Sequence, residues 1–342
     1  MDTIKEDFKL KFSICMPVYN GGSVILETLK SILSQSFNNY EIIIVDNNSI
    51  DNTADVVNSI KDPRIKYYKN SRNLGYPRNL EICRKKANNE IIFLMGHDDI
   101  LAKDALLKTY NAFMIIDDIG AVSRAYYWFY ENITKPVRAK KTISNNTAYS
   151  ILYINDDPKK VLVLLSSLDQ LSGLAFRREF MDIGFHEDIF PCHAYPFASI
   201  LKEHPVVFLN EYTVAVRIGT SQSRNIPDIY RLSPLQSWVN MFESVYAEEK
   251  YKEFRTHYIK NFVSKNYVGL VQIRNYAEYK YLLREIYLLL KYRWKNIFNF
   301  SFWFYAVGCL IIPPFILIPL VDWYKNKIMS RDLKSVKFEY RI

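Results

Sequence analysis

The feature that most constrains this chain is a set of polar clusters, each placed directly after an apolar run within the first hundred residues. The runs are short and bounded by turn residues, as expected for buried strands. In an open α/β sheet, ligands bind outside the carboxyl ends of the strands, so three such clusters predict one polar, acidic site. The runs span residues 12–18, 41–45 and 91–95, and the clusters are Tyr19 and Asn20, residues 46–49, and residues 97–99.

The rest of the N-terminal half alternates between strand and helix patterns, which predicts an α/β fold built on a doubly wound, mostly parallel sheet. A further strand is expected at residues 64–69, and helices at 24–34, 51–60, 76–87 and 103–116. After Gly120 the alternation loosens. The patterns there predict strands at 121–130, 171–177, 206–209 and 213–218, a helix within 151–168, and a helical region over 234–292.

The first strand-to-helix turn excludes two common nucleotide-binding chemistries. Residues 18–23 read Val-Tyr-Asn-Gly-Gly-Ser, with neither the G-x-G-x-x-G of dinucleotide-binding domains nor the lysine of a P-loop. Asp98 and Asp99 suit a different use, because Mg²⁺ and Mn²⁺ commonly take one or two carboxylates together with substrate phosphates. The alternative for this acidic pair is capping of the helix that follows.

Four segments together resemble the nucleotide-sugar half of family 2 glycosyltransferases, which have the GT-A fold. The resemblance implies an inverting transfer from a nucleotide-diphosphate sugar, with a UDP-sugar as the expected donor, to a hydroxyl of a glycan or lipid-linked acceptor. It is specific over residues 12–120 and weaker over 121–225. The segments are residues 13–20 (SICMPVYN), 44–53 (IVDNNSIDNT), 73–79 (NLGYPRN) and 96–99 (GHDD).

The resemblance also implies roles for individual residues. Pro17, Tyr19 and Asp46 would hold the nucleobase, with Asn20 in the same pocket, and Asn73 and Arg78 would line the nucleotide site, Arg78 near the phosphates. Residues 217–223 resemble the segment that closes over the diphosphate, although an ordinary polar loop explains them equally well. An aromatic face, an acceptor for a base N–H and a guanidinium are what a nucleoside diphosphate needs.

The chain departs from the family pattern at two catalytic positions. The Asp-x-Asp signature falls on residues 96–98, so its first acid is replaced by Gly96, and Asp98 and Asp99 are expected to carry the metal and its catalytic role. The Glu-Asp pair that supplies the general base falls on His193 and Ala194. An unperturbed imidazole titrates near ~6.5 and could act as the base.

Other base assignments remain open. Glu187 and Asp188 could supply the base if the loop is threaded differently. If no base is present, the protein would be a membrane-anchored nucleotide-sugar-binding protein with little turnover.

Charge and hydropathy set the C-terminal part apart. Residues 250–342 hold 17 Lys/Arg against 6 Asp/Glu, and residues 302–321 carry no charge and are mostly apolar. Basic flanks and interfacial aromatics predict attachment to a membrane rather than binding to nucleic acid. Because Pro313 and Pro314 interrupt the stretch, a hairpin lying in the membrane plane fits as well as a span.

We therefore expect a GT-A-like domain at 1–225, a helical basic region at 226–295, and a membrane-associating segment with a basic tail at 296–342. The four cysteines are widely separated, which argues against a zinc site or a disulfide framework. Residues 1–11 are charged and lack an apolar leader core. These features predict a location at the cytoplasmic face of the inner membrane.

Overall fold

The computed structural model describes residues 8–219, 222–333, 336 and 338–341. A mixed sheet of ten strands runs through the α/β part, in the order β3-β2-β1-β4-β9-β6-β10-β5, with β7 added to β6 and β8 to β10. The strands are β1 (Phe12–Val18), β2 (Tyr40–Asp46), β3 (Ile65–Lys69), β4 (Ile91–Leu94), β5 (Ile100–Leu101), β6 (Ala121–Phe129), β7 (Arg138–Ala139), β8 (Tyr149–Leu152), β9 (Ala175–Arg177) and β10 (Val206–Arg217).

The predicted α/β class is confirmed, because β1, β2, β3 and β4 pair in parallel and helices cover both faces. Alternate residues of β1 point to opposite faces of the sheet, and each face is covered by its own set of helices. Ile14 and Met16 pack with α1 (Ile25–Leu33), α2 (Thr53–Ser59) and α4 (Ala105–Phe113). Cys15 faces α3 (Tyr76–Lys86), α5 (Pro158–Ser166) and α6 (Ala194–Glu203). A strand with both faces buried has apolar residues on both, so it reads as a continuous apolar run.

The second half of the sheet differs from the expectation in several strands, since β7 and β8 were not expected and β9 covers only the end of the expected 171–177. Residues 206–217 form the single strand β10, where two strands were expected. Its register against β6 shifts between Leu209 and Tyr212 and again between Tyr212 and Val214. Such irregularities bend a strand without ending it, and they produced the break in the sequence pattern.

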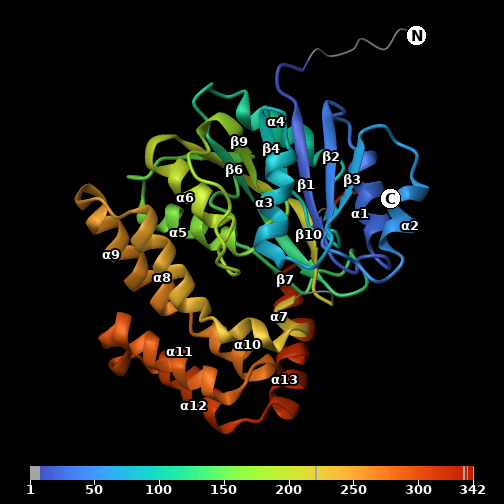
Figure 1. The fold of residues 1–342 in the computed structure, drawn as a ribbon. Coiled ribbons are helices and arrows are strands. Elements are labelled where there is room, and N and C mark those ends of the chain that lie inside the picture. The colour runs from blue at the N-terminus through green and yellow to red at the C-terminus, as the bar shows by residue number, and fades with distance from the viewer. Residues whose placement is uncertain (1–7, 220–221, 334–335, 337, 342) are drawn as a thin grey trace.

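Helices after residue 221 form a layer beneath the carboxyl ends of the strands, as Figure 1 shows in yellow to red. One apolar cluster runs from Cys15 to Leu317, so this layer and the sheet share a core. The domain boundaries expected at 225 and 295 stay predictions. The helices are α7 (Gln222–Asn225), α8 (Pro234–Val245), α9 (Lys252–Asn261), α10 (Val268–Tyr276), α11 (Tyr279–Tyr292), α12 (Phe300–Ile311) and α13 (Pro314–Lys327).

The expected membrane segment is divided between two short helices. Asn299 caps α12 by accepting a hydrogen bond from the Phe302 amide at 3.0 Å, and the chain turns at Pro313 into α13. None of the helices in the described part of the chain has both the length and the apolar character needed to cross a bilayer.

The C-terminal tail returns to the α/β part. Lys103 N donates to Glu339 O at 2.7 Å, and Phe338 meets the Tyr127 ring edge-on at 5.1 Å between centroids. The described tail residues thus pack on the sheet domain.

Candidate functional site

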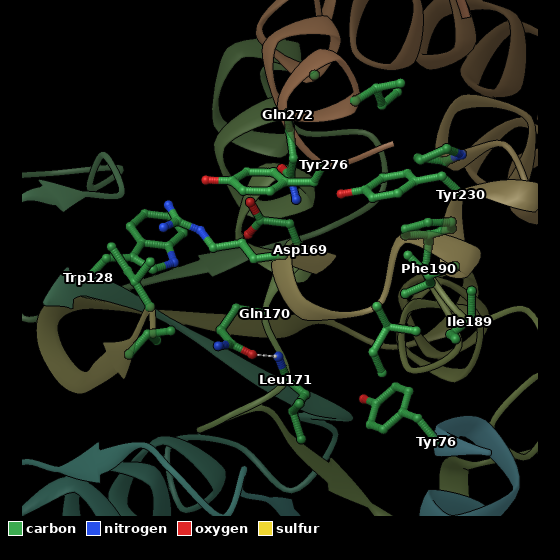
Figure 2. A pocket seen from close by; sticks show the side chains of 18 of the residues that line it. Tyr76, Trp128, Asp169, Gln170, Leu171, Ile189, Phe190, Tyr230, Gln272 and Tyr276 are labelled. Carbon is green, nitrogen blue, oxygen red and sulfur yellow. Dashed lines mark hydrogen bonds between the residues drawn. The ribbon is translucent and has the colours of Figure 1, made fainter. Parts of the chain in front are cut away.

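A cavity of about 680 Å³ lies at the carboxyl ends of the strands, between the sheet and the C-terminal helices (Figure 2). Its residues come from two sources. We call the first group the strand-end wall, and it consists of Pro17, Tyr19, Asn47, Asn73 and Asp98. We call the second group the loop-and-helix wall, and it consists of Trp128, Arg138, Asp169, Arg224, Tyr276 and Lys325.

The strand-end wall contains three of the residues expected to hold a nucleotide. Pro17, Tyr19 and Asn73 line the cavity, and the Tyr19 side chain is accessible at 36% relative exposure. Asn47 joins them, because its Nδ2 donates to Asn73 Oδ1 at 2.7 Å and its Oδ1 accepts from the Leu74 amide at 2.8 Å. The sequence placed Asn47 in the right cluster but gave it no role.

Asp46 and Asn20 hold the adjoining loops and do not line this cavity. Asp46 is fully buried, and its two oxygens accept hydrogen bonds from the Ser49 amide at 2.7 Å and from the Tyr67 hydroxyl at 2.5 Å. Asn20 adopts φ 51°, and its Oδ1 accepts from the Ile50 amide at 3.0 Å. Each Asp46 oxygen thus has one partner within the chain, and recognition of the base by Asp46 stays a prediction.

Arg78 points away from the cavity expected to hold phosphates. Its guanidinium pairs with Glu187 at 3.1 Å, and both side chains are largely exposed, at 60% and 73%. They border a second hollow on the outer side of α3. This placement argues against contact of either residue with the reacting groups. The basic side chain that does reach the strand ends is Arg217.

Asp98 and Asp99 both reach the cavity, but they are bound differently. Asp99 is buried, and its oxygens accept from the Arg217 amide at 3.0 Å and from the Ser172 hydroxyl at 2.5 Å. Burial, and then the charge of Asp98, raise the pKa of Asp99 to about 8. Of the two acids, Asp98 is thus the better placed to hold a cation, and Asp99 holds the end of β10 against the loop.

Gly96 explains the acid missing from the family signature. A Cβ at this position would lie 3.0 Å from Asp98 Oδ1 and 3.1 Å from Ser172 Oγ. The Gly96 amide also donates to Ser172 Oγ at 2.8 Å. An aspartate here would crowd the hydrogen bonds that fix Asp99.

The residues present fit a divalent metal only in part. In the part of the chain that the structure describes, no three His, Cys, Asp or Glu side chains gather closely enough to form a protein-only metal site. Mg²⁺ and Mn²⁺ need fewer, since substrate phosphates and water complete their coordination. Asp98 at the mouth of the strand ends supplies one such carboxylate.

His193 lines the cavity but is buried, at 3% exposure, at the start of α6. Its Nε2 lies 2.8 Å from Leu168 O, and its Nδ1 lies 3.8 Å from Cys192 Sγ. Burial lowers the pKa of His193 to about 4. These features argue against His193 as the base, because a buried imidazole with such a low pKa is a poor proton acceptor near neutral pH.

Asp188, the remaining acid considered as a base, is held by the helical layer. Its Oδ1 accepts from the Ser237 hydroxyl of α8 at 2.6 Å, and it does not line the cavity. The hydrogen bond instead ties the 186–189 loop to the C-terminal helices.

Sequence reasoning missed Asp169, which points into the cavity in Figure 2. It ends the short 3-10 helix η1 (Ser167–Asp169), and its side chain is 43% exposed. The carboxylate pairs with Lys140 at 2.7 Å and accepts a hydrogen bond from the Tyr126 hydroxyl. No motif surrounds Asp169 in the sequence, so only its placement reveals it.

A buried arginine holds the segment that carries Asp169. Arg124 has no exposed surface and donates to three carbonyls, those of Ser172 at 2.5 Å, Ser167 at 3.1 Å and Gln170 at 2.8 Å. Gly173, at φ +85°, leaves room for it, since a Cβ there would lie 2.9 Å from Arg124 Nε. We call residues 167–172 the clamped segment. The bond between His193 and Leu168 O adds a fourth attachment.

Comparison with known proteins agrees with this geometry. A model of the family described as Glycosyl transferase family 2 matches residues 13–167. An uncharacterized glycosyltransferase of Haemophilus influenzae is 29% identical over 214 residues, which cover 60% of this chain and 79% of that protein. The family match ends at residue 167, within the clamped segment. It therefore covers the strand-end wall and leaves out most of the loop-and-helix wall.

Two further relatives are informative. The Escherichia coli UDP-Glc:alpha-D-GlcNAc-diphosphoundecaprenol beta-1,3-glucosyltransferase WfaP is 39% identical over 87 residues, or 25% of this chain and about a third (35%) of that protein. The structure of Staphylococcus aureus TarS 1–349 in complex with UDP-GlcNAc superposes with a TM-score of 0.63 at 14% identity. It covers 96% of this chain and 90% of TarS 1–349. At that identity the superposition shows a shared fold, including the C-terminal helical layer.

Proposed function

Starting from the finding that this chain belongs to glycosyl transferase family 2 through residues 13–167, we propose that it is an inverting enzyme using a nucleotide-diphosphate sugar, with a UDP-sugar as the donor. The acceptor is a hydroxyl of a glycan or lipid-linked molecule in bacterial surface polysaccharide synthesis. The observation that carries the proposal is the strand-end wall, where an aromatic ring, two amides and a carboxylate meet in one cavity. That set suits a nucleobase, a ribose and a diphosphate.

At the strand ends, this chain's residues bind and orient the donor. Tyr19 offers a ring face to the base, and Asn47 and Asn73 offer amide groups fixed by their mutual hydrogen bond. Arg217 is held in place by Glu27 at 2.5 Å and by Asp98 O at 3.2 Å. Asp98 would hold Mg²⁺ or Mn²⁺, which when bound neutralises charge on the departing diphosphate.

For the proton of the acceptor hydroxyl, we propose Asp169 in place of His193, Glu187 and Asp188. Asp169 is the carboxylate on the clamped segment, and its side chain lines the cavity and is 43% exposed. Arg124 and His193 act as positioning residues, because they fix the backbone on both sides of Asp169. A general base must lie within hydrogen-bond reach of the proton it accepts, and rigid support favours that geometry.

The test of the donor proposal is a thermal-shift titration of the full chain with UDP and with GDP, each with and without Mn²⁺. We expect UDP to raise the melting temperature more than GDP, and Mn²⁺ to strengthen the effect. Asp98→Asn should remove the Mn²⁺ dependence, whereas Asp322→Asn, a cavity carboxylate on α13, should keep it. Folded protein that responds to neither nucleotide would contradict the proposal.

We also propose that the α12–α13 hairpin lies in the membrane interface at the cytoplasmic face. The support is its exposed apolar surface, with Phe300 at 84%, Phe304 at 65% and Phe315 at 76% exposure. Lys327 and Arg331 follow the hairpin, and cationic residues beside an apolar face favour anionic lipid. Phe300→Ser with Phe304→Ser and Phe315→Ser should abolish sedimentation with phosphatidylglycerol vesicles. Full retention by this variant would reject the hairpin as the anchor.

A further inference from the structure

Three cations from distant parts of the chain line the loop-and-helix wall. Arg138 comes from β7, Arg224 from α7 and Lys325 from α13. Within the described residues, none of them forms an ion pair with a carboxylate, whereas Arg217 at the strand ends is paired with Glu27. These three cations therefore have no direct carboxylate partner within the described residues, although Asp169 and Asp322 line the same cavity.

Aromatic rings hold the two guanidinium groups in place. The Arg138 Cζ lies 3.6 Å from the centre of the Trp128 ring. The Arg224 Cζ lies 5.5 Å from the Tyr276 ring and 5.9 Å from the Tyr130 ring. Stacking on a ring fixes the plane of a guanidinium while leaving its N–H donors free to bind an anion.

The electrostatic environment of Lys325 agrees with this arrangement. Burial, followed by the charges of Arg224 and Arg138, lowers the pKa of Lys325 to about 8. The Asp322 carboxylate acts against this shift, and it accepts a hydrogen bond from the Tyr130 hydroxyl at 2.7 Å. The other acid of this wall, Asp169, is paired with Lys140, so the three cations exceed the one remaining carboxylate and leave a local positive charge that a bound anion would satisfy.

The surroundings of these cations are apolar. Leu270 and Ile273 of α10 and Ile318 and Val321 of α13 line the same cavity. On its other side, α13 exposes apolar side chains to solvent, including Ile316 at 50%. A phosphate group at the cations would thus have an apolar surface beside it, leading toward the exposed hairpin.

We propose that Arg138, Arg224 and Lys325 bind the phosphate of a lipid-linked diphosphate acceptor, with its hydrocarbon chain on the apolar surface of α10 and α13. This inference rests on the proposed function and names the acceptor class for it. The strand-end wall has its own groups for the donor diphosphate, Asp98 and Arg217. WfaP, which shares the N-terminal part, acts by name on a diphosphoundecaprenol-linked sugar.

The test uses farnesyl diphosphate as a short, soluble probe, with binding measured by calorimetry. Arg138→Gln combined with Lys325→Gln should weaken its binding at least ~10-fold, since two charge-assisted contacts to the phosphate are lost. UDP binding should change by less than about two-fold. Lys160→Gln is the matched control, because it removes the same charge from an exposed position of α5 outside the cavity and away from the hairpin.

Several outcomes would overturn the inference. Unchanged farnesyl diphosphate binding in the double variant would show that the cations bind no acceptor phosphate. If UDP binding fell as much as farnesyl diphosphate binding, the three cations would belong to the donor site. Competition by a ribitol-phosphate oligomer but not by farnesyl diphosphate would replace the lipid with a phosphodiester polymer.

Two controls complete the design. Inorganic diphosphate should bind more weakly than farnesyl diphosphate, and farnesol should not compete with farnesyl diphosphate. Equal binding of the two diphosphates would show that the apolar surface of α10 and α13 does not bind the hydrocarbon chain. Lys325→Gln alone serves if the double variant unfolds. Wild-type protein that binds farnesyl diphosphate but not UDP would count against the donor proposal and leave this one standing.

Discussion

The two walls of the cavity are built in different ways. The strand-end wall comes from short segments between residues 17 and 98, and each polar side chain follows a strand of one parallel group. The loop-and-helix wall draws on residues between 128 and 325, from a hairpin strand, a 3-10 helix and three separate helices. The first wall follows from local pattern, whereas the second exists only when distant elements pack.

The contrast predicts that changes in the two walls separate donor binding from transfer. A variant of the strand-end wall should lose nucleotide affinity. A variant of the loop-and-helix wall should keep that affinity and lose transfer to the acceptor. Four substitutions test this division.

The largest effect is expected for Asp169→Asn. An amide cannot accept the hydroxyl proton, so kcat should fall by roughly 10²–10⁴-fold. UDP affinity should remain within about two-fold of wild type, because no strand-end residue changes. The measurement is steady-state transfer together with a UDP titration, with Asp98→Asn as the donor-side comparison. Unchanged turnover would remove Asp169 from the mechanism.

Arg124→Met should have the next largest effect, on stability. Three buried carbonyls lose their donor, and leaving such groups unsatisfied costs on the order of 3 kcal/mol in the free energy of unfolding. Arg177→Met is the matched control, because Arg177 is also buried and donates to the Ile119 carbonyl at 3.0 Å, away from the clamped segment.

Chemical denaturation measures the stability of both arginine variants, and turnover per folded molecule measures the site. Both variants should be destabilised, but only Arg124→Met should lose transfer. Equal losses of transfer in the two variants would mean that the clamp has no specific role.

His193 makes stability depend on pH. Its pKa is about 4 in the folded protein, below the usual value for an exposed histidine, so between about pH 6.5 and 4 the unfolded chain binds the extra proton. The contribution of His193 to stability should therefore fall as the pH decreases through this window, by about 2 kcal/mol at pH 5 relative to neutral, and it is measured as the difference between wild type and a His193 variant, because the raised pKa of Asp99 acts in the opposite direction. His193→Asn should flatten this part of the stability profile. If His193→Asn left the dependence of stability on pH unchanged, His193 would not be buried as a neutral imidazole in the folded protein.

Glu187→Gln should have the smallest effect. Its pair with Arg78 is exposed, and such pairs contribute about 0–1 kcal/mol. Turnover should stay within about two-fold of wild type. Measuring kcat for Glu187→Gln and Asp169→Asn side by side tests which of the two carboxylates is the base. A large loss of kcat in Glu187→Gln would assign the base to Glu187 instead of Asp169.

Part of the site could be predicted from the sequence for a physical reason. Parallel strands with both faces buried need apolar residues at every position, so the change to polar residues marks the strand end. That rule located Tyr19 and Asp98 but did not say which side chain of the cluster at residues 46–49 faces the cavity. The family resemblance supplied Asn73, which lines the cavity, and Arg78, which does not.

By itself, the sequence determined the α/β class, the order of the first strands and the edge of the sheet where the cavity lies, because apolar periodicity and strand-end polarity are local. Tertiary structure alone decided the rest. Arg124, Asp169 and Lys325 have no motif, and their roles depend on burial and on partners from distant parts of the sequence. Desolvation by such partners also gave His193 a low pKa that no local pattern could reveal.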